Sequence, residues 1–176
     1  MEAKPFMTNN ADVIVPVDLE YDIHLKDKTL SDYTMTQQIS EWLHDNLESL
    51  IDDNENKVFN KINYGFNEDN LRNFGNKPTC DVYSNNVEYD TIMNENKPTK
   101  VHTIIIFYFK GANNKAYMKL CELHDYIMQE FANNEDFQVL PGVVRDTYID
   151  NSKLMTRSIR KQWGVMGAFE LTHILF

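Results

Sequence analysis

The side chains that most often bind metals or catalyse reactions are few in this sequence and widely spaced. The histidines are His24, His44, His102, His124 and His173. No two of them stand in the HxH, HxxxH or HExxH spacings that bring two imidazoles to one ion, so a zinc site would need ligands from distant segments. The two cysteines, Cys80 and Cys121, have no second cysteine nearby. The sequence therefore predicts no metal site and no disulfide framework, and its thiols fit a reducing cytosol.

The motifs that hold nucleotides or activate a nucleophile are also absent. With six glycines in all, the chain contains neither GxGxxG nor GxxxxGK[ST], and it has no GxSxG elbow. Cys121 and His124 would share one face of a helix and point into the core, with no third group to orient the imidazole. We therefore expect no catalytic residues, no cofactor and no enzymatic activity.

An acidic cluster follows the first predicted helix and consists of Asp52, Asp53 and Glu55. An EF-hand loop needs a glycine at its sixth position and a glutamate at its twelfth, and the sequence supplies neither. The pattern favours a solvated acidic loop over a cation site.

One basic cluster near the end of the chain is a candidate interface: Lys153, Arg157, Arg160 and Lys161. In a regular strand Lys153 and Arg157 have the same parity, so both would project from one face. Three interpretations remain open. The cluster could contact an acidic neighbouring protein, it could contact passing nucleic acid, or it could protect an exposed edge strand from aggregation.

Two helices are expected to support these segments. Met35, Ile39, Leu43 and Leu47 repeat at helical spacing, which predicts a first helix that stops between Leu50 and Asp52. A second helix is expected over 114–133, where Asn113 or Asn114 caps the start and the pair Asn133-Asn134 ends it.

The strands are expected mainly in the second half. The β-branched and aromatic run 101–109 is typical of a central strand covered on both faces. Further strands are predicted at 79–83 and 87–93 around a turn at 84–86, at 143–149 and 154–159 around a turn at 150–151, and at 165–176. The expected fold is α+β, with a mixed, mostly antiparallel sheet and two main helices packed on one face.

Residues 1–30 differ from the rest and are predicted to form an N-terminal extended arm or edge strand, followed by a single α+β domain over 31–176. Pro16 interrupts the apolar run 13–17 and cannot donate to a sheet ladder. Apolar and polar residues then alternate with period two from Leu19 to Lys26. An arm that packs on a neighbouring subunit has the same pattern.

The charge is unevenly distributed along the chain. Among the 176 residues, 101–176 hold eight basic and eight acidic side chains, so the net charge of −10 falls entirely in 1–100. Such asymmetry can give neighbouring copies surfaces of opposite sign, or it can simply keep loops hydrated. It disfavours strong non-specific binding to nucleic acid, which needs a cationic surface. The longest apolar run, 104–109, is too short to span a bilayer.

The order of these expected elements resembles the tail terminator, or tail-completion (head–tail joining), proteins of long-tailed bacteriophages. The resemblance is carried by the helix Thr34 to Asp52, the block VHTIIIFYFK, the helix Asn114 to Asn133 and the end VRDTYIDNSKLMTRSIRKQWGVMGAFELTHILF. In that family the last two strands form a hairpin on an open sheet and the chain ends on a strand. The extended start, 1–30, departs from the shorter members.

The resemblance implies a structural virion protein that forms a homo-oligomeric ring, commonly a hexamer, at the head-proximal end of the tail tube. Such a ring ends tube polymerisation and joins the head connector. The implied partners are copies of itself, the tail tube protein and a head connector or stopper protein, with DNA only passing through the lumen and no membrane. The implied location is the tail or neck of the virion, and the host cytoplasm during assembly. The alternatives are another phage neck or connector subunit, or a small acidic intracellular binding or inhibitor protein.

Overall fold

The computed structural model describes residues 31–65, 75–90, 97–111, 113–159 and 162–176. The arm predicted at 1–30 lies outside this part of the chain. The elements are α1 (Ser31–Ser49), β1 (Lys61–Tyr64), β2 (Thr79–Asp90), β3 (Lys97–Lys110), α3 (Asn114–Asn133), the short 3-10 helix η2 (Glu135–Phe137), β4 (Val144–Ile159) and β5 (Gln162–Leu175).

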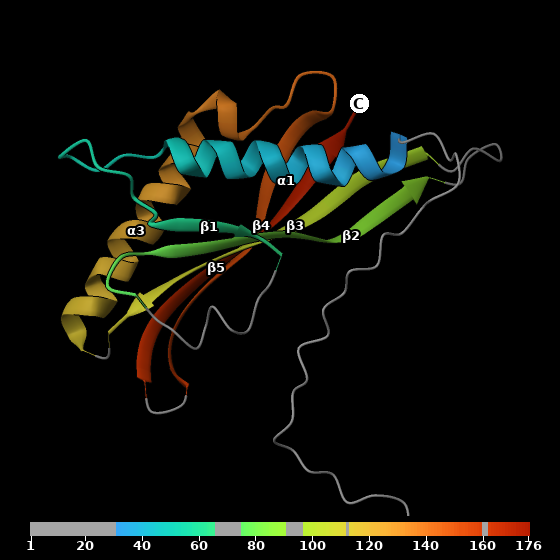
Figure 1. The fold of residues 1–176 in the computed structure, drawn as a ribbon. Helices are drawn as coiled ribbons and strands as arrows, with labels where there is room; N and C mark the ends of the chain where they lie inside the picture. Colours follow the sequence, from blue (N-terminus) through green and yellow to red (C-terminus); the bar gives the residue numbers. More distant parts are fainter. Residues whose placement is uncertain (1–30, 66–74, 91–96, 112, 160–161) are drawn as a thin grey trace, which may run out of the picture.

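The strands form one twisted five-stranded sheet in the order β1-β2-β3-β5-β4 (Figure 1). β1 pairs parallel to β2, and every other neighbouring pair is antiparallel. β3 lies at the centre, as its continuous apolar sequence predicts, and β4 forms one edge. The α+β class with a mixed, mostly antiparallel sheet is confirmed.

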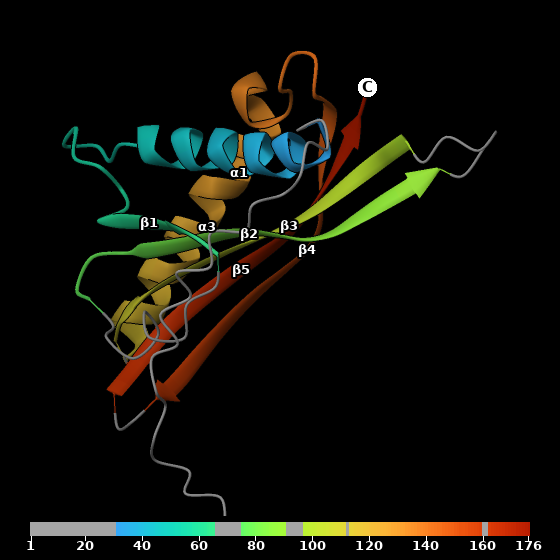
Figure 2. The ribbon, with the colours of Figure 1, turned by 45° about the vertical axis from the view of Figure 1, so that its right-hand side comes forward.

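Both helices lie on the same face of the sheet (Figures 1 and 2). The core lies between them and alternate residues of the strands, such as Ile105 and Phe107 of β3 and Phe169 of β5. Each fully buried aliphatic or aromatic side chain of this kind contributes roughly 1.5–3 kcal/mol relative to its exposed state. Because both helices pack on the same face, the predicted placement of the two helices is correct.

The second helix forms where its sequence predicts it. Asn113 is the N-cap, and its side-chain oxygen accepts a hydrogen bond of 2.9 Å from the backbone N–H of Ala116. Leu120, Ile127 and Phe131 face the core at helical spacing. The first helix ends at Ser49, one residue before the expected range.

Two of the predicted turns are β-bulges inside continuous strands. β2 runs through 84–86, with a register shift against β3 between Ser84 and Asn86. β4 runs through 150–151, with a shift against β5 between Ile149 and Asn151. Each bulge accommodates one extra residue without ending the strand. The hairpins predicted at these two places are therefore wrong, because a polar Asn or Asp signal looks the same at a bulge and at a turn.

Gly167 permits a close approach at the centre of the sheet. It pairs with Phe107 across β3 and β5, and the Phe107 ring covers it on the helix side. A Cβ at position 167 would lie 2.2 Å from Cζ of Phe107, closer than real Cβ atoms come to a neighbour. The glycine predicted as a bend point is thus a packing position.

We expect Gly167→Ala to lower the free energy of unfolding by roughly 1–3 kcal/mol, because the added methyl displaces the buried Phe107 ring. Urea denaturation of the wild type and the variant measures the change. Phe107→Leu removes the clashing ring edge, so the double variant should lose less stability than the two single losses added together. Simple additivity would contradict a direct clash.

Candidate interface on the open face and edge of the sheet

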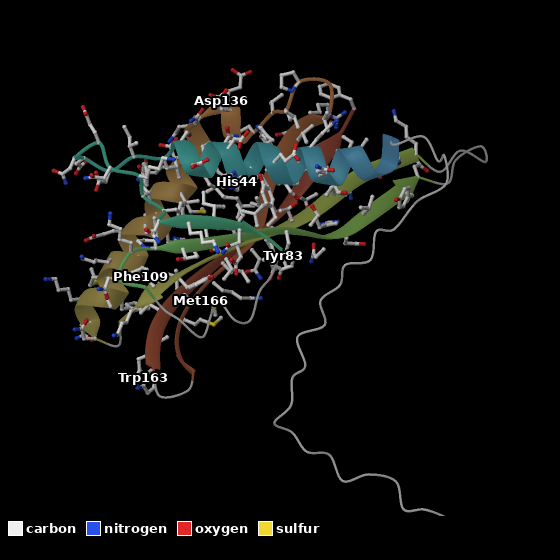
Figure 3. The ribbon with its side chains drawn as sticks, viewed as in Figure 1. His44, Tyr83, Phe109, Asp136, Trp163 and Met166 are labelled. Carbon is white, nitrogen blue, oxygen red and sulfur yellow. The ribbon has the colours of Figure 1, made fainter. Side chains whose placement is uncertain are left out.

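The sheet has a second face, opposite α1 and α3, which we call the open face. Among the described residues, no helix lies on it (Figure 2). The strand register places on it the side chains of Tyr83 of β2, His102 of β3, Met166, Glu170 and Thr172 of β5, and Lys153 of β4. Figure 3 shows Tyr83 and Met166 on the side of the sheet away from α1, and Trp163 at the far end of the β4–β5 hairpin.

The predicted interface residues belong to β4 and to the segment after it. Lys153 pairs with Ala168, and Arg157 pairs with Gly164, so the expected shared parity holds along the backbone. The side chain of Arg157, and the whole of Arg160 and Lys161, lie outside the described part of the chain. A single basic patch made by all four residues stays a prediction.

Lys153 already has a partner. Its Nζ lies 2.9 Å from Oε1 of Glu170 on the neighbouring strand, and both side chains are about half exposed. The Lys153 ammonium and the amide of Asn151 hold the pKa of Glu170 below its usual value. An exposed ion pair of this kind contributes little to stability and leaves the lysine able to exchange partners.

β4 is an unusually long edge strand, at 16 residues. Within the described chain β5 is the only strand that pairs with it. A single bridge joins its first residue, Val144, to Leu140, and beyond that bridge the outer N–H and C=O groups of β4 face no other strand. Register shifts near Arg145 and Asp150 disturb the first half, whereas the register from Asn151 to Ile159 is regular. An edge of this length is a template for pairing with another chain.

A row of polar side chains crosses four strands of the open face. Nδ1 of His102 lies 2.9 Å from Oγ1 of Thr172, and its Nε2 lies 2.8 Å from Oε1 of Glu88. The Thr172 hydroxyl donates to Asp150, and Lys100 pairs with Glu88 at 3.0 Å. Hydrogen bonds from His102 and then Lys100 lower the pKa of Glu88. Only the strand register brings these residues together, so no sequence spacing predicted the row.

Thr172, His102 and Glu88 have the hydroxyl–imidazole–carboxylate order of a nucleophilic triad. In a triad the imidazole accepts the proton of the hydroxyl, whereas the Thr172 hydroxyl donates to Asp150. Thr172 is only 7% exposed, and the backbone around it takes part in the ladders to both neighbouring strands. The geometry thus fits a cross-strand network that fixes the register, and it provides no free backbone N–H groups for an oxyanion.

The other candidate reactive residues have structural surroundings. The His124 ring stacks on Phe169 with centroids 4.8 Å apart, and its Nδ1 lies 3.1 Å from the carboxylate of Asp125. Cys121 is a free, half-buried thiol. Asp52 accepts hydrogen bonds of 2.9 Å from the backbone N–H of Asn56 and then that of Asn54, which lower its pKa and shape the loop.

One cluster with metal-ligand chemistry was not predicted from the sequence. His44, Asp45 and Glu48 on α1 bring one ligand atom each within 4.8 Å of one another. His44 Nδ1 lies 3.3 Å from Asp45, its ring stacks on Tyr64, and Glu48 pairs with Lys57 at 2.6 Å. The imidazole of His44 and the carboxylate of Glu48 thus already interact with other side chains of the protein.

Comparison with known proteins gave no match. No protein-family model matches this sequence, and no curated protein matches it. Neither helix of the described chain is long and apolar enough to cross a membrane.

His173 lies on the helix side of β5, and its surroundings shift its pKa. It is fully buried, its Nδ1 lies 3.0 Å from Oγ1 of Thr147, and the Trp42 ring packs against it at 5.8 Å. Its Nε2 has no hydrogen-bond partner among the described residues. Burial, followed by the charge of His102, lowers the pKa of His173 from 6.5 to about 3.

We expect His173 to make the fold sensitive to acid. The unfolded chain takes up a proton at position 173 near pH 6.5, whereas the folded chain takes it up only near pH 3. The contribution of His173 is therefore complete above pH 6.5 and is lost as the pH falls towards 3. Between pH 7 and pH 5 the loss should be about 2 kcal/mol. Urea denaturation at several pH values measures it, and His173→Gln should flatten that part of the curve. An equal pH dependence in the variant would rule out His173 as the source.

Proposed function

We propose that this chain is a structural assembly subunit that forms a closed ring with copies of itself. The proposed ring is of the kind formed by the phage tail terminators that the sequence resembles. The observation that carries the proposal is the long outer edge of β4, in a fold where two helices cover one face of an open sheet and β4 and β5 form a hairpin. β5 follows β4 in the chain and pairs with it in antiparallel orientation, as the hairpin of the resembled family does. The tail tube and a head connector are the further partners that this role requires.

A ring of identical subunits needs two unlike surfaces that fit each other, because each copy contacts one neighbour on each side. An acidic helix and the basic half of β4 lie at opposite edges of the sheet. α1 carries no lysine or arginine, and its exposed acids include Glu41 and Asp45. It packs over β1 and β2, whereas the basic residues Lys153 and Arg157 belong to β4 at the opposite edge. Acidic side chains of α1 at one edge and basic side chains of β4 at the other favour head-to-tail association.

The charge reversal Arg157→Glu with Arg160→Glu tests this arrangement. We expect the double variant to fold normally but to assemble poorly, because it replaces two cations beside an edge strand with anions. Size-exclusion chromatography with light scattering and negative-stain micrographs measure ring formation, and circular dichroism measures folding.

A matched control makes the same change in net charge elsewhere. Lys115 and Lys119 are exposed on α3, so Lys115→Glu with Lys119→Glu should leave the rings intact. Normal rings from the Arg157 and Arg160 variant, or equal losses from both variants, would refute a specific role for the β4 edge. A wild-type protein that stays monomeric even beside tail tube protein would refute the terminator role itself.

A further inference from the structure

The outer side of β4 offers a site for one more strand. Its regular half, Asn151–Ile159, has no bulge, and its outer backbone groups face no strand of the described chain. Lys153 and Met155 project from the open face, and Leu154 projects towards the core between them. On the open face, a strand added here would lie beside the basic and apolar side chains of β4. On the helix side, it would lie beside the apolar side chain of Leu154.

One segment of the chain has the complementary pattern. From Asp18 to Leu25, acidic or polar residues alternate with Leu19, Tyr21, Ile23 and Leu25. As a strand it would therefore present carboxylates on one face and apolar side chains on the other. Asp18 and Asp22 stand four residues apart, as Lys153 and Arg157 do.

We propose that residues 18–25 of a neighbouring copy pair with the outer edge of β4 as a sixth strand, an inference that rests on the proposed ring. Asp18 and Asp22 lie beside Lys153 and Arg157, and Leu19 and Tyr21 extend the apolar face beside Leu154. In either strand direction this register places Glu20 opposite Met155. The backbone hydrogen bonds supply the attraction, and the charges select the register.

The positions of the two segments favour a neighbour over the same copy. Residues 18–25 precede α1, which begins near the end of β2 at Asp90 (Figure 1). Through the strand register, that end of the sheet coincides with Val144, the start of β4. Lys153 and Arg157 lie towards the other end of the sheet, and α1 lies over the opposite edge. To reach them within one copy, the segment would have to cross both the width and the length of the sheet.

Disulfide trapping in the full-length chain tests the pairing directly. Residues opposite each other on neighbouring strands have Cβ atoms about 4.5–5.5 Å apart, close enough for a disulfide after small shifts. Copies with Glu20→Cys are mixed with differently tagged copies with Met155→Cys, both in a Cys121→Ser background, and oxidised. We expect a covalent heterodimer on non-reducing gels. The matched control replaces Met155→Cys with Lys61→Cys, which is exposed on the opposite edge strand β1 and should give no heterodimer.

The outcomes separate the inference from the proposed function. A heterodimer with Met155→Cys alone supports the sixth strand. Rings without that heterodimer overturn the inference and leave the ring proposal intact. A heterodimer without rings supports the strand pairing and overturns the ring. A chain carrying both cysteines that cross-links only within itself, while the mixture gives nothing, overturns pairing with a neighbour.

A charge swap gives an independent readout. Asp18→Lys with Asp22→Lys, or Lys153→Glu with Arg157→Glu, should each weaken association about tenfold or more, because like charges then face each other. Combining all four substitutions should restore most of the affinity measured by light scattering. Losses that simply add would overturn the proposed register.

Discussion

The pairing of β3 with β5 is the constraint on which the rest of the structure depends. From Lys100 to Lys110 the two strands keep one register without a bulge. This register sets Phe107 over Gly167 on the helix side and His102 beside Thr172 on the open face. Side chains alternate between the faces, so a slip by one residue would exchange the core and solvent faces of β5. The clash that any larger residue makes at position 167 further restricts the register.

The outer strands depend on this central pair. β2 and β4 each contain a bulge near the middle, and in both cases the strand on either side keeps its apolar residues in the core. Each bulge absorbs one residue that would otherwise reverse the alternation. Asp150, the extra residue of the bulge in β4, accepts a hydrogen bond from the Thr172 hydroxyl and so joins the polar row. The row thereby ties β4 to the central pair on the face where no described helix packs.

The sequence predicts the elements that rest on local signals. The boundaries of α3 follow from an asparagine cap and helical apolar spacing, and the central place of β3 follows from its unbroken β-branched run. Other features depend on contacts between distant residues and carry no local signal. Among these are the bulges read as turns, the parallel pairing of β1 with β2, and the row joining Glu88, His102 and Thr172. The basic residues of β4 were recognisable from composition, but the ion pair of Lys153 with Glu170 depends on the register.

The features of β4 that hinder unwanted strand pairing differ between its two halves, and this difference bears on the role of the edge. Bulges blunt the first half of the strand, whereas the second half is regular and carries Lys153 and Arg157. Bulges and charged side chains both protect exposed edge strands, so the two halves of β4 are protected by different means. Cations on a regular edge act selectively, because they disfavour pairing of two β4 strands with each other and admit a strand of opposite charge. The regular half therefore combines backbone groups that can pair with a further strand and cations that select a strand of opposite charge. Specific pairing with an added strand requires both.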